Sequence, residues 1–113
     1  MAYCFFSVPF QARYHYIPND YWRFTPASLK KILQANGFKN ITITNRGTDI
    51  TVALYKIISV IYRWLRGNLF EKSIGIIFFP IVIFSLIIGH CTLRWNIGSP
   101  DDCLGYCVTA GKV

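Results

Sequence analysis

The chain has 113 residues, a formal net charge of +7 and four cysteines. An apolar fraction of 53% with only 15% charged residues excludes a disordered, solvating tail, and four cysteines are too few for a disulfide-dense secreted scaffold. The apolar residues are unevenly distributed, because no Asp, Glu, Lys or Arg occurs from residue 73 to residue 93. We therefore divide the chain into a segment of soluble type (1–48), an apolar segment (49–93) and a closing segment of mixed polarity (94–113).

The first segment predicts a strand, a long loop and a helix. The continuous apolar run Tyr3–Val8 suits a strand that is covered on both faces. Thr25 is a good helix N-cap, and Pro26 suits the first helical position, where its missing N–H costs nothing. Apolar residues then recur on one face until Gly37, which suits the left-handed residue that follows a helix. We predict a helix over residues 26–36.

Two further strands are expected after this helix. β-branched residues alternate with period two over residues 39–45, which indicates a strand. Residues 104–110, near the end of the sequence, have the composition of another strand. Because a helix separates the first two strands along the chain, the pattern favours an α/β sheet.

The loop between the first strand and the helix carries most of the polar side chains of chemical interest. Residues 9–24 include His15, Asp20 and Arg23 among several aromatic residues. Ligands of open parallel sheets bind beyond the carboxyl ends of the strands, where this loop begins. His15 could act as a base near neutral pH, and Asp20 and Arg23 could pair with each other or hold a polar ligand. Taken singly, each of these residues is more simply interpreted as packing over the helix, and we favour that alternative.

Several short runs in this part of the chain together carry a family resemblance. They are Ser7-Val8-Pro9-Phe10, then His15, then Pro18-Asn19-Asp20-Tyr21-Trp22-Arg23-Phe24-Thr25-Pro26, and then Gly37-Phe38. In this combination the chain resembles class I S-adenosylmethionine-dependent methyltransferases with a type 11 domain. The resemblance implies an α/β fold: the carboxyl-terminal part of a Rossmann-like seven-stranded sheet, interrupted by an apolar helical hairpin. It covers residues 3–48 well and residues 104–112 more loosely, as strands five, six and seven, with the seventh antiparallel between its neighbours.

The same resemblance implies a function and a set of site residues. S-adenosylmethionine would be the methyl donor, His15 a catalytic base or acceptor-orienting group, and Asp20, Tyr21 and Arg23 the residues that bind the acceptor. However, none of the eight glycines forms the G-x-G of a donor-binding turn, and a seven-stranded domain with its helices needs roughly 170 residues. We therefore expect the acceptor-side portion of a methyltransferase, inactive alone, with an unidentified methyl acceptor and a missing amino-terminal half as a potential partner.

The first part of the apolar segment predicts an amphipathic helix over residues 50–65. Lys56, Ser59, Arg63 and Arg66 fall within about an 80° arc of such a helix, and apolar residues fill the remainder. A narrow basic face beside a broad apolar face is typical of a helix that lies in a membrane interface. It is also compatible with an ordinary packing helix that has a solvated basic stripe.

The second part of the segment, residues 74–90, is free of charge, and the run to Leu93 just reaches the length of about 20 residues that a membrane span needs. If the closing strand returns to the same sheet, the number of crossings must be even or zero. Two spans would place Lys56 and Arg63 inside the bilayer, at a cost of about 2.5–3.5 kcal/mol each. We therefore favour a cytoplasmic, membrane-associated chain whose hairpin, residues 50–66 and 74–90, lies on one leaflet or dips into it.

The side chains expected to touch the membrane are Ile57, Ile61, Trp64, Phe78, Phe79 and Phe84. The alternative is a small, non-enzymatic integral membrane protein with two membrane helices. The basic charge suits an anionic membrane surface, because each basic residue near such a surface contributes about 1 kcal/mol of binding free energy. It does not suggest nucleic acid, because the basic residues form no run. The spacing of the cysteines and histidines predicts no metal site, and free reduced thiols are expected.

Overall fold

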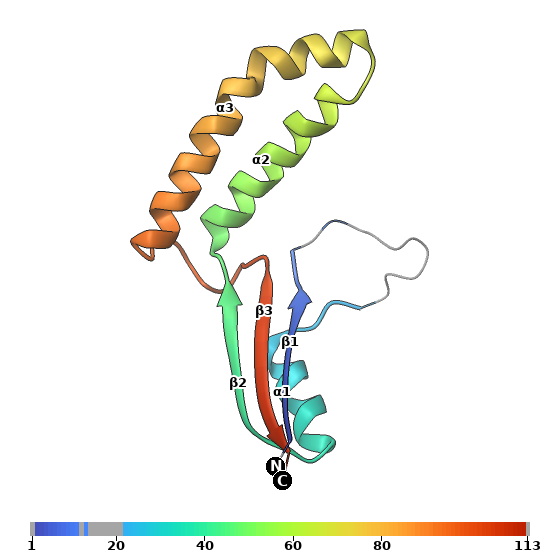
Figure 1. Cartoon of the computed structure of the whole chain (residues 1–113), viewed down its shortest axis with the longest axis vertical. Coiled ribbons are helices and arrows are strands. Elements are labelled where there is room, and N and C mark those ends of the chain that lie inside the picture. Colours follow the sequence, from blue (N-terminus) through green and yellow to red (C-terminus); the bar gives the residue numbers. More distant parts are fainter. Residues whose placement is uncertain (1, 12, 14–21, 113) are drawn as a thin grey trace. The chain divides into compact units, whose positions relative to one another are not determined.

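The computed structural model of the chain describes residues 2–11, 13 and 22–112, which contain three strands and three helices (Figure 1). They form two compact units. The sheet unit comprises Met1–Gly47 and Asp102–Val113, and the hairpin unit comprises Thr48–Asp101.

The sheet unit contains β1 (Ala2–Pro9), β2 (Phe38–Arg46) and β3 (Gly105–Lys112), in the order β1-β3-β2. The central strand β3 is antiparallel to both neighbours, so β1 and β2 run parallel to each other on either side of it. Figure 1 shows β3 between the two outer strands, although it is the last strand in the sequence. The strand expected at the end of the chain is therefore present, and it joins the two strands expected before it.

The predicted seven-stranded, Rossmann-like sheet is wrong for this chain. In the part of the chain that the structure describes, the sheet has three strands, and every pairing between neighbours is antiparallel. The expectation that β1 is covered on both faces also fails, because Tyr3 and Phe5 are 77% and 74% exposed. The physical reason is that one helix, α1, packs against the sheet and buries only alternate side chains of β1.

The helix α1 (Pro26–Ala35) begins and ends as its sequence predicts. Thr25 Oγ1 accepts a hydrogen bond from the backbone N–H of Ser28 at 3.3 Å, and the Ser28 hydroxyl accepts one from the Thr25 N–H at 3.0 Å. This capping box satisfies two of the backbone donors that a helix start leaves unpaired. Gly37 follows the helix with a φ of +80°, a conformation that favours glycine.

The core of the sheet unit lies between α1 and one face of the sheet. Leu29 and Leu33 are the buried residues of the helix, four residues apart on one face. They pack with the side chains of β3 that point to the same face, and with partly buried side chains of β1 and β2. The buried core residues are Leu29, Leu33, Cys103, Tyr106, Val108 and Ala110.

The hairpin unit consists of α2 (Asp49–Leu65) and α3 (Leu69–Arg94), which lie side by side (Figure 1). The connection between the two helices is three residues long rather than the expected seven, because α3 begins at Leu69. Asn68 is its N-cap, and the backbone N–H of Asn68 donates to the Glu71 carboxylate at 3.1 Å. Figure 1 also shows that α3 is bent in its first half, where Pro80 lies and where the proline ring removes one helical hydrogen bond.

The two ends of the hairpin unit are tied to each other by hydrogen bonds. The backbone N–H of Asp49 donates to the Ser99 carbonyl at 3.1 Å, and the Ser99 N–H donates to Asp49 Oδ1 at 2.8 Å. Thr48 Oγ1 also donates to the carbonyl of Ile97 at 3.3 Å. The start of α2 and the segment after α3 are therefore held together within this unit.

Candidate functional site

A small polar cluster lies where β1 and β2 end and β3 begins. Pro9 and Arg46, the last residues of the two outer strands, both face Gly105 in the pairing register. Leu104 is fixed between them, because its carbonyl accepts from Phe10 N at 2.9 Å and its N–H donates to the Arg46 carbonyl at 3.0 Å. The segment 102–106 therefore lies at the carboxyl ends of two parallel strands.

Three titratable side chains of that segment are close together. Tyr106 is 3% exposed and packs against the ring of Phe10, with 5.6 Å between the ring centroids. Burial raises the pKa of Tyr106 to about 12, and the hydrogen bond with Cys103 and the charge of Asp102 act in the same direction. Cys103 is fully buried and donates to the Gly105 carbonyl at 3.2 Å.

Asp102 is the least satisfied member of this cluster. Its Oδ1 is buried and has no hydrogen-bond partner among the described residues. A buried carboxylate oxygen without a hydrogen-bond partner is uncommon in proteins. Here it leaves an unused hydrogen-bond acceptor near Tyr106, at the end of the sheet. The sequence analysis missed Asp102 and Tyr106, since only the return of β3 to the ends of β1 and β2 brings them together.

The predicted acceptor-binding loop is only partly covered by the structure. His15, Asp20 and Tyr21 lie outside the described residues. Arg23 is half-buried, and its guanidinium donates to the carbonyl of Trp22 at 3.0 Å and to the carbonyl of Arg13 at 3.5 Å. In the described residues Arg23 therefore binds backbone of the loop that was expected to hold the acceptor. Among these residues no group of three His, Cys, Asp or Glu side chains could hold a metal ion.

The second candidate region is the hairpin. Its helix α3 buries small and polar residues and exposes large apolar ones, which is the reverse of a helix in a soluble protein. Its buried residues are Gly75, Ser85 and Thr92. Its large apolar residues point outward, with Ile77 at 71% and Phe84 at 66% exposure. Water-soluble proteins bury such side chains and expose polar ones. The described helix α3 is also long and apolar enough to cross a membrane, by length and composition.

The small residues of α3 form the contact with α2. A Cβ atom on Gly75 would lie 3.0 Å from the Leu65 backbone nitrogen, and one on Gly89 would lie 3.4 Å from Leu54 Cδ1. Small residues at such positions let two helices approach closely, which is the usual packing of helices in lipid. The signal was present in the sequence, because Gly75 and Gly89 are two heptads apart and Ser85 and Thr92 are one heptad apart.

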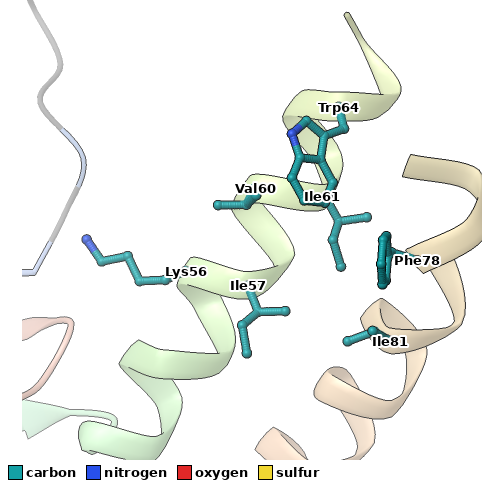
Figure 2. Close-up of a pocket in the computed structure, with 7 residues that line it drawn as sticks. All are labelled: Lys56, Ile57, Val60, Ile61, Trp64, Phe78 and Ile81. Carbon is teal, nitrogen blue, oxygen red and sulfur yellow. The ribbon is translucent and has the colours of Figure 1, made fainter. Parts of the chain in front are cut away.

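An apolar pocket of about 360 Å³ lies between the two helices (Figure 2). Five of its lining residues come from α2 and two from α3, and one of the seven carries a charge: Lys56, Ile57, Val60, Ile61, Trp64, Phe78 and Ile81. In Figure 2, Ile61 and Phe78 point toward one another across the pocket, whereas Lys56 extends away from α3. The rings of Trp64 and Phe78 are 6.1 Å apart and tilted by 47°.

The six residues expected to touch a membrane are found in different surroundings. Ile57, Phe78, Phe79 and Phe84 are exposed on the hairpin, and Trp64 is half-buried. Ile61 is only 4% exposed, so it packs inside the hairpin and the expectation for this residue is not met. Six of the most exposed apolar residues of α3 were not expected to touch the membrane: Leu69, Phe70, Ile76, Ile77, Leu86 and Ile87.

Comparisons with known proteins assign no family to this chain. No protein-family model, no curated protein and no solved structure matches it significantly.

Proposed function

We propose that the chain is attached to a membrane by its α2–α3 hairpin. The observation that carries this proposal is the distribution of residues on α3, which buries Gly75, Ser85 and Thr92 and exposes large apolar side chains along its length. In water the exposed surface would be a strong aggregation liability, because contiguous apolar patches of this kind are rare on soluble monomers. In lipid the same surface is the favourable one, and close contact of small residues holds the helix pair together.

The sheet constrains how the hairpin can enter the bilayer. β2 leads into α2, α3 leads into β3, and β2 and β3 are paired neighbours in one sheet. A folded sheet cannot be divided by a membrane, so the two ends of the hairpin stay on one side. Either both helices cross the bilayer or neither does.

The charges of the hairpin favour the arrangement in which neither helix crosses. α2 has 17 residues and a length of about 26 Å, short of the hydrocarbon thickness of about 30 Å. Lys56 and Arg63 are exposed on it, and a crossing would place Lys56 well inside the hydrocarbon. We infer that α2 lies among the headgroups with its basic face toward water, and that α3, which is free of charge from residue 73 to residue 93, lies deeper in the same leaflet.

Flotation of the purified chain with liposomes tests the attachment. The chain should float with vesicles that contain anionic lipid, and substitution of Ile77 and Phe84 by Glu should leave it at the bottom of the gradient. Substitution of the sheet residues Tyr3 and Phe5 by Glu is the matched control and should leave flotation unchanged. Equal flotation of the parent and the α3 variant would refute the attachment by α3.

Labelling of single cysteines tests the topology. A cysteine at Asn68, between the two helices, and one at Lys39 in β2 should react with a membrane-impermeant reagent from the same side of sealed vesicles. Labelling of position 68 from the opposite side would show two spans, as in the alternative of a small integral membrane protein with two membrane helices.

A second candidate function concerns the sheet unit, which we propose to be the acceptor-side portion of an S-adenosylmethionine-dependent methyltransferase. The arrangement that supports it is β3, antiparallel between two parallel strands, with α1 against one face of the sheet. The unpartnered Asp102 oxygen and the neutral Tyr106 lie at the carboxyl ends of β1 and β2 and offer polar groups to a ligand at that end of the sheet. In this function the protein would mainly position the acceptor.

Two observations test this second candidate. Isothermal titration with S-adenosylmethionine should show no binding to the chain alone, because the sequence has no glycine-rich donor turn; tight binding would contradict a role restricted to the acceptor side. The DNA upstream of the Met1 codon should contain an open frame that encodes a strand, a glycine-rich turn and a helix. Its absence would remove the support for a methyltransferase origin.

A further inference from the structure

The pocket on the hairpin has an apolar interior, and one lining residue, Lys56, carries an ammonium group that lies outside it. Its interior is formed by aliphatic and aromatic side chains of both helices, and Trp64 and Phe78 lie near one end. Lys56 contributes the one charged side chain and projects outward from α2 (Figure 2). A ligand that fills this site therefore needs an apolar part for the interior and an acidic or neutral part near Lys56.

The charge of Lys56 has no counterion in the described part of the hairpin. No ion pair is found there for Lys56 or for Arg63, which is exposed about two turns further along the same face of α2. Asp49 uses its carboxylate at the base of the hairpin, where Oδ1 accepts from the N–H groups of Ile50 and Ser99. Glu71 caps α3 at the other end. Among the described residues of the hairpin, the two cations thus have no counterion, and an anionic ligand would compensate their charge.

We propose that this pocket binds one acyl chain of an anionic phospholipid, whose phosphate is held by Lys56 and Arg63. The proposal rests on the membrane attachment proposed above and names the lipid that the hairpin selects. A volume of about 360 Å³ is within the range of small-molecule sites and accommodates part of one chain. The position of Lys56 on the outer side of α2 places the phosphate at the headgroup level, and the acyl chain occupies the pocket lined by Ile61 and Phe78.

Other ligand classes fit the site less well. An inorganic phosphate would gain little from a pocket whose lining surface is apolar, and a sugar would leave its hydroxyl groups unpaired among apolar side chains. A neutral phospholipid could place its chain but would not compensate the two exposed cations. The anionic lipid satisfies both requirements of the site.

Trp64 supplies an internal probe for the experiment, because it lines the pocket. Trp22 and Trp95 are replaced by Phe so that Trp64 is the one tryptophan of the chain. The full-length protein is bound to phosphatidylcholine vesicles that contain the same small fraction of either brominated phosphatidylglycerol or brominated phosphatidylcholine. A basic residue near the surface gains about 1 kcal/mol from an anionic lipid, so we expect the brominated phosphatidylglycerol to be enriched at Trp64 about fivefold over the neutral lipid.

Matched variants separate a specific site from general attraction of anionic lipid to a basic protein. Lys56→Gln should remove most of the difference between the two quenchers, whereas Lys72→Gln makes the same change in net charge outside the pocket and should leave the difference intact. Val60→Phe should fill part of the pocket and reduce quenching by both lipids while flotation persists.

The outcomes distinguish this proposal from the membrane attachment on which it rests. Equal quenching by the two lipids in a chain that floats, or equal loss in Lys56→Gln and Lys72→Gln, would overturn the anionic-lipid site and leave the attachment standing. Failure of the parent chain to float would overturn both.

Discussion

Tyr106 shows how a single residue links burial to pH-dependent stability. Its ring belongs to the core of the sheet unit, and burial raises the pKa of its hydroxyl from 10.0 to about 12. In the unfolded chain the hydroxyl ionises near pH 10, so between pH 10 and pH 12 the unfolded state binds fewer protons than the folded state. The stability supplied by the neutral tyrosine is therefore fully present below pH 10 and is lost as the pH rises through 12.

We accordingly predict that alkaline solution destabilises the sheet unit, with a loss in the free energy of unfolding that approaches about 3 kcal/mol above pH 12. The measurement is denaturant unfolding followed by circular dichroism between pH 8 and pH 12. Tyr106→Phe removes the ionising group and should flatten the pH dependence above pH 10, although it also loses the hydroxyl hydrogen bond. An identical alkaline slope in the Tyr106→Phe variant would show that another group is responsible.

Local residue chemistry was readable from the sequence, and long-range chemistry was not. Thr25 and Gly37 bound α1 as expected, because a cap and a left-handed residue act within one helical turn. Asp102 and Tyr106 come together with the ends of β1 and β2 only through strand pairing between residues far apart in the sequence, such as Pro9 with Gly105 and Arg46 with Gly105. No periodicity or short motif near residue 102 predicts that these side chains lie beside the ends of β1 and β2.

The contact between α2 and α3 depends on small residues of α3, which let the two helices approach each other closely. Gly75 is buried, and an added Cβ would meet the backbone and the side chain of Leu65 at 3.0 Å. Backbone cannot move aside as a flexible side chain can, so a larger residue must push the two helices apart. Because the outer surface of α3 is apolar, this contact is what distinguishes the folded hairpin from two separate helices in lipid.

We predict that Gly75→Val destabilises the hairpin by about 1–3 kcal/mol, the usual cost of overpacking a filled site. Its stability can be measured by titration of the micelle-bound chain with sodium dodecyl sulfate, with the emission of Trp64 as the signal. Ile77→Val, two positions away on the exposed face, is the control and should behave as the parent chain. Parent-like stability of Gly75→Val would mean that the helices do not pack through this glycine in a micelle.

For α3, the sequence predicted the apolar character of the helix better than the residue at which the helix begins. The expected helix over residues 74–90 begins instead at Leu69, because Asn68 and Glu71, which lie between the two expected helices, form a capping box. The basic stripe of α2 was recognised, but the small-residue seam of α3 was not. The heptad spacing of Gly75 and Gly89 is present in the sequence, but it indicates a close helix contact only together with a partner helix such as α2.

At the scale of the whole molecule, the chain is one small sheet whose two adjacent strands are separated in sequence by a hairpin of a different chemical character. Composition identified that boundary because charge and hydropathy change abruptly near residues 49 and 94. The seven-stranded, Rossmann-like sheet, by contrast, was expected from the family resemblance, and the three-stranded antiparallel sheet of the described residues contradicts it. A family resemblance that rests on a few short runs of sequence concerns only those runs. It does not determine the sheet that the whole chain forms.

The sheet unit should fold without the hairpin. Its core residues, its strand pairs and α1 all lie in residues 1–47 and 102–113. The Leu104 N–H donates to the Arg46 carbonyl at 3.0 Å, so the two cut ends lie close enough for a short Gly-Ser turn in place of residues 48–101. A shorter connection also lowers the entropy cost of bringing β2 to β3, which grows slowly with the length of the intervening chain.

We therefore predict that the shortened chain retains a folded three-stranded sheet, stays in solution without detergent and does not float with vesicles. Hydrogen exchange gives the decisive measurement, because the amides of β3, with a neighbouring strand on each side, should exchange more slowly than those of β1 and β2. Val108→Ala, which removes a fully buried side chain, serves as the destabilised reference and should speed that exchange. Uniformly fast exchange in the shortened chain would show that the sheet depends on the hairpin, and flotation of a folded sheet unit would place membrane contacts outside α2 and α3.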